Sequence, residues 1–154
     1  MEFEGYRVEI VADNDHGSPW EENDGHGPVS EWTQRGKEPG EYVLCEDRGS
    51  FRYYDFAEAC RIARRDGWGS EPYNVPGESK RERAARAALA DFDHLRRWCA
   101  GDWHYVGVVV RPNGACRVCG PSASLWGIES ESFDYMDDVA RDLIEELEAE
   151  AVEA

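Results

Sequence analysis

The sequence has no long hydrophobic run: none of its apolar stretches approaches the roughly 18 to 20 residues that cross a bilayer. The first five residues, Met1–Gly5, carry neither a basic cluster nor an apolar segment, which predicts that there is no secretory signal. Both absences favour a cytoplasmic protein that contacts no membrane.

Recognisable catalytic signatures are absent as well. The chain has no Gly-x-Ser-x-Gly turn, no glycine-rich phosphate loop with a lysine and no His-Glu-x-x-His helix. The remaining candidates for acid–base or nucleophilic chemistry are scattered along the chain: His16, His26, Ser30 and Ser124. The sequence therefore favours a protein that is not an enzyme and that needs no cofactor.

Positive charge is scarce relative to negative charge. The chain has 33 acidic and 17 basic residues, a net charge of −16. Residues 1–47 hold 13 acidic and 3 basic residues, and residues 121–154 hold 11 acidic residues against the single base Arg141. Residues 48–120 are mildly basic. A negative charge of this size keeps a protein soluble and disfavours direct binding to DNA or to anionic membranes.

The length and the aromatic content favour a single domain over residues 1–154. A mass of 17.5 kDa fits one core, and the six Trp, seven Tyr and five Phe supply large apolar area. Two segments lack a regular pattern: a long irregular loop at about 13–40 and a linker with Pro and Gly at about 69–78. A loop as long as the first is typically functional or mobile.

Alternating apolar and polar residues predict strands in the first third of the chain. The clearest example is 6–12, where Tyr, Val and Ile would share one face. A hairpin is expected from 41–46 and 51–53, joined by a turn at 47–49.

A second hairpin is expected later in the chain. Residues 103–110 are rich in β-branched and aromatic side chains, as in a central strand. The Asn113-Gly114 pair favours a type I′ turn, which predicts a return strand over 115–119. Residues 124–128 would extend the sheet beyond the Gly-Pro break.

Capping signals bound two helices. The first is expected to follow the N-cap Asp55 and to stop at Gly67, and the second to begin at the capping box of Ser79 and Glu82 and to stop at Gly101. A third helix follows near the C-terminus. The resulting order, β-(ββ)-α-α-(ββ)-α, predicts an α+β fold with a mainly antiparallel sheet.

The last predicted helix, 134–149, places its apolar residues on one stripe and its carboxylates on the opposite face. Carboxylates three or four positions apart lie about 5 to 6 Å apart, which approaches the spacing of backbone phosphates. A protein that binds phosphates with Lys and Arg can accept such a face in place of DNA. The predicted partner-binding residues on this helix are Asp134, Asp138, Asp142, Glu145 and Glu146.

The long loop supplies a second set of candidate binding residues. Two tryptophans lie among acidic residues, and aromatic side chains in a charged loop are typical binding anchors. The predicted set is Trp20, Glu21, Glu22, Asp24 and Trp32.

Cys116 and Cys119 have the spacing at which two thiolates of one turn bind a zinc ion. A second cysteine pair is missing, so a Cys2His2 site would need His16 and His26, which share one loop. The alternative is a pair of ordinary thiols, reduced in the cytosol. A thioredoxin-like role is less favoured, because the pair follows a hairpin turn rather than entering a helix.

Three stretches resemble small, mostly uncharacterised acidic proteins of bacteriophages and prophages: DGHGPVSEW at 24–32, YDFAEACRIARRDGW at 54–68 and SLWGIES at 124–130. The resemblance covers most of the chain. By class, such proteins are similar to inhibitors of host defence, including anti-CRISPR and anti-restriction proteins. The resemblance implies a protein of the host cytosol that binds and inhibits a basic host protein or protein–nucleic-acid complex, and it assigns no role to an individual residue.

Two alternatives stay open. One is a metal-binding or small hydrolytic protein that uses the acidic loop 13–32. The other is a phage accessory protein of DNA metabolism whose basic centre faces nucleic acid through Arg61, Arg64, Arg65, Arg81, Arg83 and Arg86.

Overall fold

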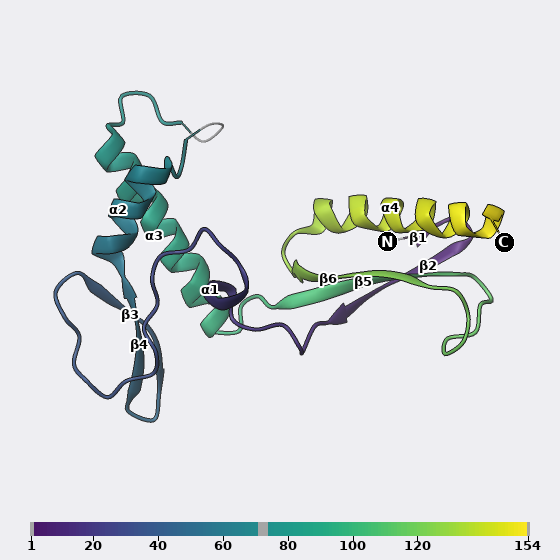
Figure 1. Ribbon diagram of the computed structural model, residues 1–154, viewed down its shortest axis with the longest axis horizontal. Coiled ribbons are helices and arrows are strands. Elements are labelled where there is room, and N and C mark those ends of the chain that lie inside the picture. The colour runs from purple at the N-terminus through teal and green to yellow at the C-terminus, as the bar shows by residue number, and fades with distance from the viewer. Residues whose placement is uncertain (1, 71–73, 154) are drawn as a thin grey trace. The chain divides into compact units, whose positions relative to one another are not determined.

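The structure is a computed structural model that describes residues 2–70 and 74–153 (Figure 1). The chain divides into two compact units: unit 1 comprises residues 1–16 and 103–154, and unit 2 comprises residues 17–102. Unit 2 is thus inserted between the two segments of unit 1, and each unit has its own hydrophobic cluster. The sequence predicts one domain, and the number of independently folding domains stays a prediction. The α+β fold with antiparallel sheets is confirmed.

Unit 1 is an antiparallel sheet covered on one face by a helix (Figure 1). In spatial order, its strands are β1 (Glu2–Phe3), β2 (Tyr6–Ala12), β5 (Tyr105–Pro112) and β6 (Ala123–Glu129). Helix α4 (Phe133–Glu153) follows β6. The central strand β5 is buried from Tyr105 to Val110, as its β-branched composition predicts.

The core of unit 1 forms where the apolar stripe of α4 meets alternate residues of the sheet. Val106, Val108 and Val110 of β5 belong to one buried cluster with the α4 residues Met136, Val139, Ala140, Leu143 and Leu147. The stripe predicted from the three-and-four spacing is therefore the buried face of α4. Its acidic residues are left on the outer side of the helix.

The predicted return strand over 115–119 is wrong. Gly114 has φ +81°, but Asn113 has no positive φ, so the type I′ turn does not form and Ala115 N instead donates to Pro112 O over 3.1 Å. A second turn follows, in which Gly120 N donates to Cys116 O over 3.0 Å. Pairing with β5 resumes only at Ala123, and residues 124–128 lie in β6 as predicted.

Unit 2 combines a hairpin with two packed helices. Its elements are α1 (Pro19–Glu22), β3 (Glu41–Asp47), β4 (Ser50–Asp55), α2 (Phe56–Asp66) and α3 (Lys80–Cys99). The predicted caps are confirmed: Asp55 accepts from Glu58 N, Gly67 closes α2 at φ +71°, and Ser79 and Glu82 form a capping box. Residues 71–73 of the expected linker lie outside the described residues.

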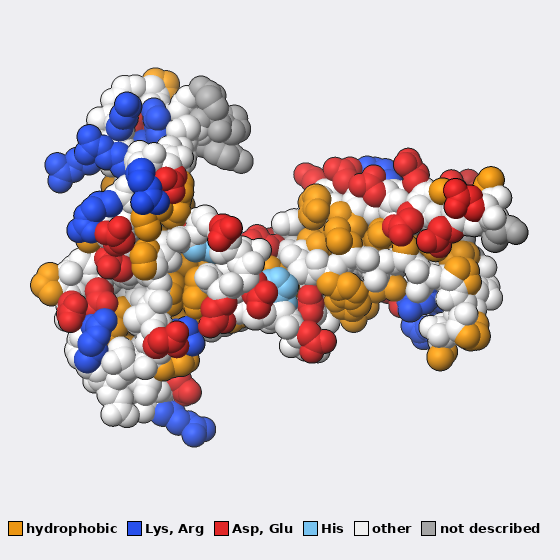
Figure 2. Space-filling view, viewed as in Figure 1, with side chains coloured by type: hydrophobic (Ala, Val, Ile, Leu, Met, Phe, Trp, Pro, Cys, Tyr) orange, Lys and Arg blue, Asp and Glu red, His pale blue; other side chains and the backbone are white. Residues whose placement is uncertain are grey.

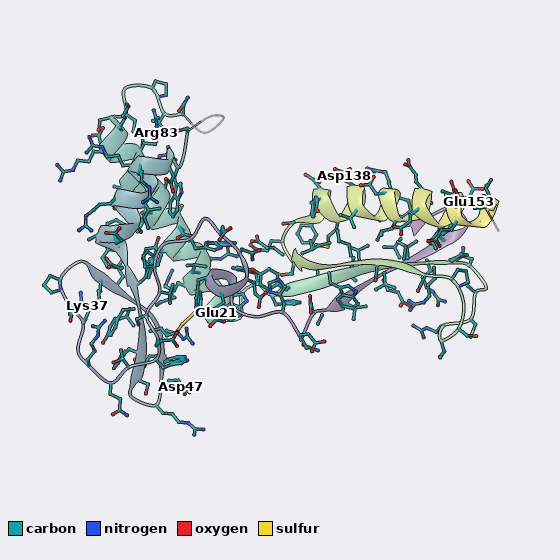
Figure 3. All side chains as sticks on the ribbon, viewed as in Figure 1. Glu21, Lys37, Asp47, Arg83, Asp138 and Glu153 are labelled. Atoms are coloured by element: carbon teal, nitrogen blue, oxygen red, sulfur yellow. A yellow bond between two sulfur atoms is a disulfide. The ribbon has the colours of Figure 1, made fainter. Side chains whose placement is uncertain are left out.

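The long loop of unit 2 is held against the hairpin rather than being wholly irregular. Bridges join Val29 to Tyr54 and Thr33 to Phe51, so part of the loop runs beside β4 as a partial third strand. A disulfide between Cys45 and Cys99 links β3 to the end of α3 (Figure 3). Among the described residues, no helix combines the length and apolar content that crossing a membrane requires.

Candidate functional site

The outer face of α4 carries a row of exposed carboxylates. All five carboxylates predicted there are exposed, and Figure 2 shows acidic side chains along this helix. Because α4 continues to Glu153, it adds exposed Glu150 and Glu153, which the shorter predicted helix missed. We call this set the α4 acidic face: Asp134, Asp138, Asp142, Glu145, Glu146, Glu150 and Glu153.

Little positive charge offsets the α4 acidic face. Arg141, the only base of the helix, bonds to Asp138 over 2.9 Å. Among the described residues, the other members of the face have no ion pair. Asp134, Asp138, Asp142, Glu146 and Glu150 also follow one another at four-residue spacing. Each such like-charge pair destabilises a helix by about 0.2 to 0.5 kcal/mol.

The loop residues predicted to bind a partner lie in unit 2, apart in the chain from α4. Glu21, Glu22 and Asp24 are exposed, and Glu21 accepts a hydrogen bond from Ser18. Figure 3 labels Glu21, which belongs to α1. The described structure therefore divides the ten predicted residues into two sets, five on α4 and five between residues 20 and 32 of the loop.

The two loop tryptophans have different surroundings. Trp20 is half-buried, packs against the core of unit 2 and lies edge-on to Trp98 with 5.4 Å between ring centroids. Trp32 is 44% exposed. The guanidinium of Arg52 lies 5.3 Å from the Trp20 ring and 5.2 Å from the Trp32 ring. Trp32 thus offers more free surface to a partner, while Trp20 also serves packing; binding by either stays a prediction.

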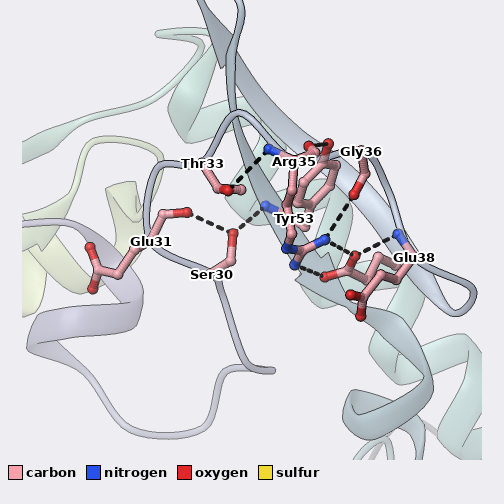
Figure 4. A network of polar contacts seen from close by, with 8 residues as sticks. Ser30, Glu31, Thr33, Arg35, Gly36, Glu38 and Tyr53 are labelled. Atoms are coloured by element: carbon pink, nitrogen blue, oxygen red, sulfur yellow. Dashed lines mark hydrogen bonds and ion pairs between the residues drawn. The ribbon is translucent and has the colours of Figure 1, made fainter.

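A polar network orders the second half of the loop (Figure 4). The Arg35 guanidinium donates two hydrogen bonds of 2.7 Å to the carboxylate of Glu41, which also accepts from Glu38 N over 2.8 Å. Tyr53 OH donates to Arg35 O over 2.8 Å, and Tyr53 N donates to the Ser30 hydroxyl over 2.9 Å. These contacts join the loop to both strands of the hairpin.

The Glu41 carboxylate makes unit 2 sensitive to acid. The hydrogen bonds from Arg35 hold the pKa of Glu41 below its ordinary value of 4.5, although burial opposes this. A carboxyl with a lowered folded pKa stabilises the fold above its unfolded pKa, and this contribution is lost as pH falls from about 4.5 through the folded value. Glu41→Gln is therefore expected to cost about 1 to 2 kcal/mol at pH 7 and much less at pH 3. Urea unfolding across this range measures both, with the exposed neighbour Glu38→Gln as the control; equal costs at both pH values would contradict the expectation.

A half-buried carboxylate, Asp91 of α3, forms a second cluster. It accepts hydrogen bonds from Tyr54 OH at 2.7 Å and from Gly27 N at 2.8 Å, and one of its oxygens lies 2.6 Å from His26 Nδ1. The space around Gly27 is full, since an added Cβ would lie 2.5 Å from the Tyr54 oxygen. We call His26, Gly27, Tyr54 and Asp91 the Asp91 cluster. Its hydrogen bonds hold the loop against α3.

The four candidate residues for catalysis contact different groups and are not brought together by the contacts described below. His26 belongs to the Asp91 cluster, whereas His16 stacks on Tyr105 with centroids 3.6 Å apart. The Ser30 hydroxyl bonds to backbone of the loop and of β4, and the Ser124 hydroxyl accepts from Trp126 Nε1 over 3.2 Å. None of these contacts pairs a serine with a histidine.

The candidate zinc ligands are not gathered into one site. Over residues 2–70 and 74–153, no group of three His, Cys, Asp or Glu side chains is placed to hold a metal ion. Cys116 and Cys119 are exposed beside one another, while His26 is bound to Asp91 and His16 stacks on Tyr105. The cysteine pair therefore offers two ligands by itself.

Ion pairs neutralise half of the predicted basic centre. Arg61, Arg65 and Arg86 pair with Glu58, Asp66 and Glu78, respectively. An open cavity of about 310 Å³ at the end of α2 is lined by Arg64, Arg65 and Arg83, together with Lys80. The six arginines therefore do not present one uninterrupted basic face.

The chain matches no protein-family model, and searches of curated proteins and of solved structures found no match.

Proposed function

We propose that this is a non-enzymatic binding protein, without a cofactor, that docks its α4 acidic face on a basic partner. The observation that carries the proposal is a row of exposed carboxylates on one helix face with a single arginine among them. In full, the proposal is an acidic phage-type protein of the host cytosol that inhibits a nucleic-acid-binding component of host defence. The phage and host-defence parts rest on the resemblance of three sequence stretches.

The dimensions of the face suit a site that otherwise holds nucleic acid. Asp134 and Glu146 are twelve positions apart, which corresponds to about 18 Å along a helix. The same length spans about five phosphates of one DNA strand. Lys and Arg side chains arranged for a phosphate backbone would therefore find several carboxylates within reach.

The carboxylates of α4 destabilise the helix electrostatically, and a cationic partner would relieve this destabilisation. Glu150 and Glu153 lie near the C-terminal end of α4, where the helix dipole already favours cations, and no basic residue lies in the last turn. Both this position and the four-residue spacing of the acids destabilise α4 through repulsion between like charges. Binding to a basic surface turns this repulsion into attraction.

The test is competition with DNA for purified bacterial defence complexes that bind nucleic acid, such as CRISPR effectors and restriction enzymes. The wild-type chain is expected to displace DNA from one such complex, and added salt is expected to weaken displacement because it screens exposed charges. A variant with Asp138→Asn, Asp142→Asn, Glu145→Gln and Glu146→Gln is expected to bind roughly 10-fold more weakly or worse, since each contact contributes about 0.5 kcal/mol.

A matched control separates the face from overall charge. Changing four other exposed acids, Glu4, Glu38, Glu46 and Asp47, to their amides removes the same number of charges. This variant is expected to bind within about twofold of the wild type. Equal losses in both variants would reject α4 as the binding face, and failure of the wild type to displace DNA from any complex at low salt would reject the inhibitor proposal.

A further inference from the structure

The turn between β5 and β6 places two exposed thiols side by side. Cys116 and Cys119 are both free and exposed, and the Cys119 thiol donates to Cys116 Sγ over 2.8 Å. Cys119 N also donates to Cys116 Sγ, over 3.4 Å. This geometry presents one sulfur as the acceptor of hydrogen bonds and the other as the donor.

Close packing of the turn backbone maintains this geometry. Gly120 N donates to Cys116 O over 3.0 Å, and a Cβ at Gly120 would lie 2.5 Å from that oxygen and 2.8 Å from Cys116 N. Gly120 is therefore required by a close approach of the chain. Arg117, between the cysteines, pairs with Glu9 of β2 over 2.8 Å and fastens the turn to the sheet.

The two thiols differ in acidity. The hydrogen bond from Cys119, supported by the backbone N–H groups of Val118, Cys119 and Gly120, lowers the pKa of Cys116 to about 7. The same thiol–thiol bond raises the pKa of Cys119. Near neutral pH, a large fraction of Cys116 is thus the nucleophilic thiolate, while Cys119 retains its proton.

We propose that Cys116 and Cys119 are a redox-active dithiol that exchanges with disulfides outside the chain, with Cys116 as the attacking thiolate. Cys116 attacks one sulfur of an external disulfide, whose bond breaks and releases one thiolate, leaving a mixed disulfide on Cys116. Cys119 then loses its proton and attacks Cys116 Sγ. The Cys116–Cys119 disulfide forms and the second external thiol leaves, so the dithiol is oxidised by two electrons and the external disulfide is reduced to two thiols.

The separation of the sulfurs favours exchange over zinc binding within one chain. Two thiolates on one tetrahedral zinc, each about 2.3 Å from the metal, lie about 3.8 Å apart. The 2.8 Å found here lies closer to disulfide formation, and within the described parts of the chain no third ligand accompanies the pair. A zinc ion shared by the pairs of two copies remains as an outcome of the test.

The test treats the full-length chain, with the Cys45–Cys99 disulfide intact and Cys60, Cys116 and Cys119 as free thiols, with oxidised glutathione and maps the products by mass spectrometry of peptides. In the wild type, the peptide holding both cysteines is expected to lose two hydrogens. Cys119→Ser is expected to retain glutathione on Cys116, at a rate at least about 10-fold above that of Cys119 in the Cys116→Ser variant. The pH profile of Cys116 alkylation in the wild type is expected to have its midpoint near 7.

The chain supplies its own control. Cys60 is half-buried and burial raises the pKa of its thiol, so it is expected to react slowly in every variant. Equal glutathione addition at Cys60 and Cys116, or equal rates in the two serine variants, would overturn the proposal. So would zinc that copurifies at one ion per two chains, resists exchange with glutathione and is lost in both variants.

Discussion

Asp91→Ala is expected to lower the free energy of unfolding by about 3 kcal/mol, because it leaves the buried Gly27 N–H without an acceptor and the half-buried His26 without its partner. The Asp91 side chain is 10% exposed and bonds to the loop at Gly27 and to β4 at Tyr54, which is fully buried. Tyr54 OH keeps its second acceptor, Ala88 O at 3.2 Å. The unpaired groups are then the Gly27 N–H and His26, and the loop loses its attachment to α3.

Urea unfolding measures the loss, and amide hydrogen exchange is expected to place it in unit 2. The control is Asp93→Ala, two residues along the same helix. Asp93 is 53% exposed and pairs with Arg96 at the surface, so its removal is expected to cost less than about 0.5 kcal/mol. A loss below 1 kcal/mol for Asp91→Ala, on the order of a surface pair, would show that the cluster does not hold the loop.

Much of the secondary structure was predictable because its signals are local. A capping box needs only Ser79 and Glu82, three residues apart, and Gly67 ends α2 because glycine adopts the positive φ of a helix end easily. The stripe of α4 likewise depends on spacing within a single helix. For the same reason the acidic residues of α4 were placed outside from the sequence alone.

The ordering of the long loop was not predictable in this way. His26 lies 65 residues and Tyr54 lies 37 residues from Asp91, so no local pattern pairs them. The bridge between Val29 and Tyr54 is equally non-local. The failed strand at 115–119 has a different cause, since two successive turns, closed by hydrogen bonds from Ala115 N and Gly120 N, replaced the single tight turn that Asn-Gly favours.

In the candidate sites, too, some features follow from local sequence signals and others do not. Exposure of the α4 carboxylates follows from helix periodicity, whereas the partition of the predicted residues between two units follows from the chain's connectivity. In the sequence, the Cys-x-x-Cys spacing is compatible with metal binding and with redox chemistry alike. The hydrogen bonds around Cys116 that distinguish these uses come first from the Cys119 thiol and then from backbone N–H groups of the turn. The backbone part of this geometry has no sequence signature beyond Gly120.

Excision of residues 17–102 is expected to leave unit 1 folded. Strands β2 and β5 pair from Tyr6 with Pro112 to Ala12 with Val106, and Asp13 N donates to Tyr105 O over 2.9 Å, so the chain enters and leaves unit 2 from adjacent points. Joining His16 to Trp103 through Asn-Gly therefore converts the insertion into a hairpin loop. All strands of the sheet, α4 and their shared buried cluster remain in the shortened chain.

The shortened chain is expected to show a dispersed amide NMR spectrum and a cooperative thermal transition, with slow exchange at Val106, Val108 and Val110. The matched control carries Val108→Asp, which buries a charge in that cluster and is expected to abolish the transition. A collapsed spectrum without cooperative unfolding would show that unit 1 depends on its insertion. If it folds, the shortened chain lacks Trp20, Glu21, Glu22, Asp24 and Trp32 but keeps the α4 acidic face, so DNA displacement equal to that of the full chain would assign binding to α4 alone.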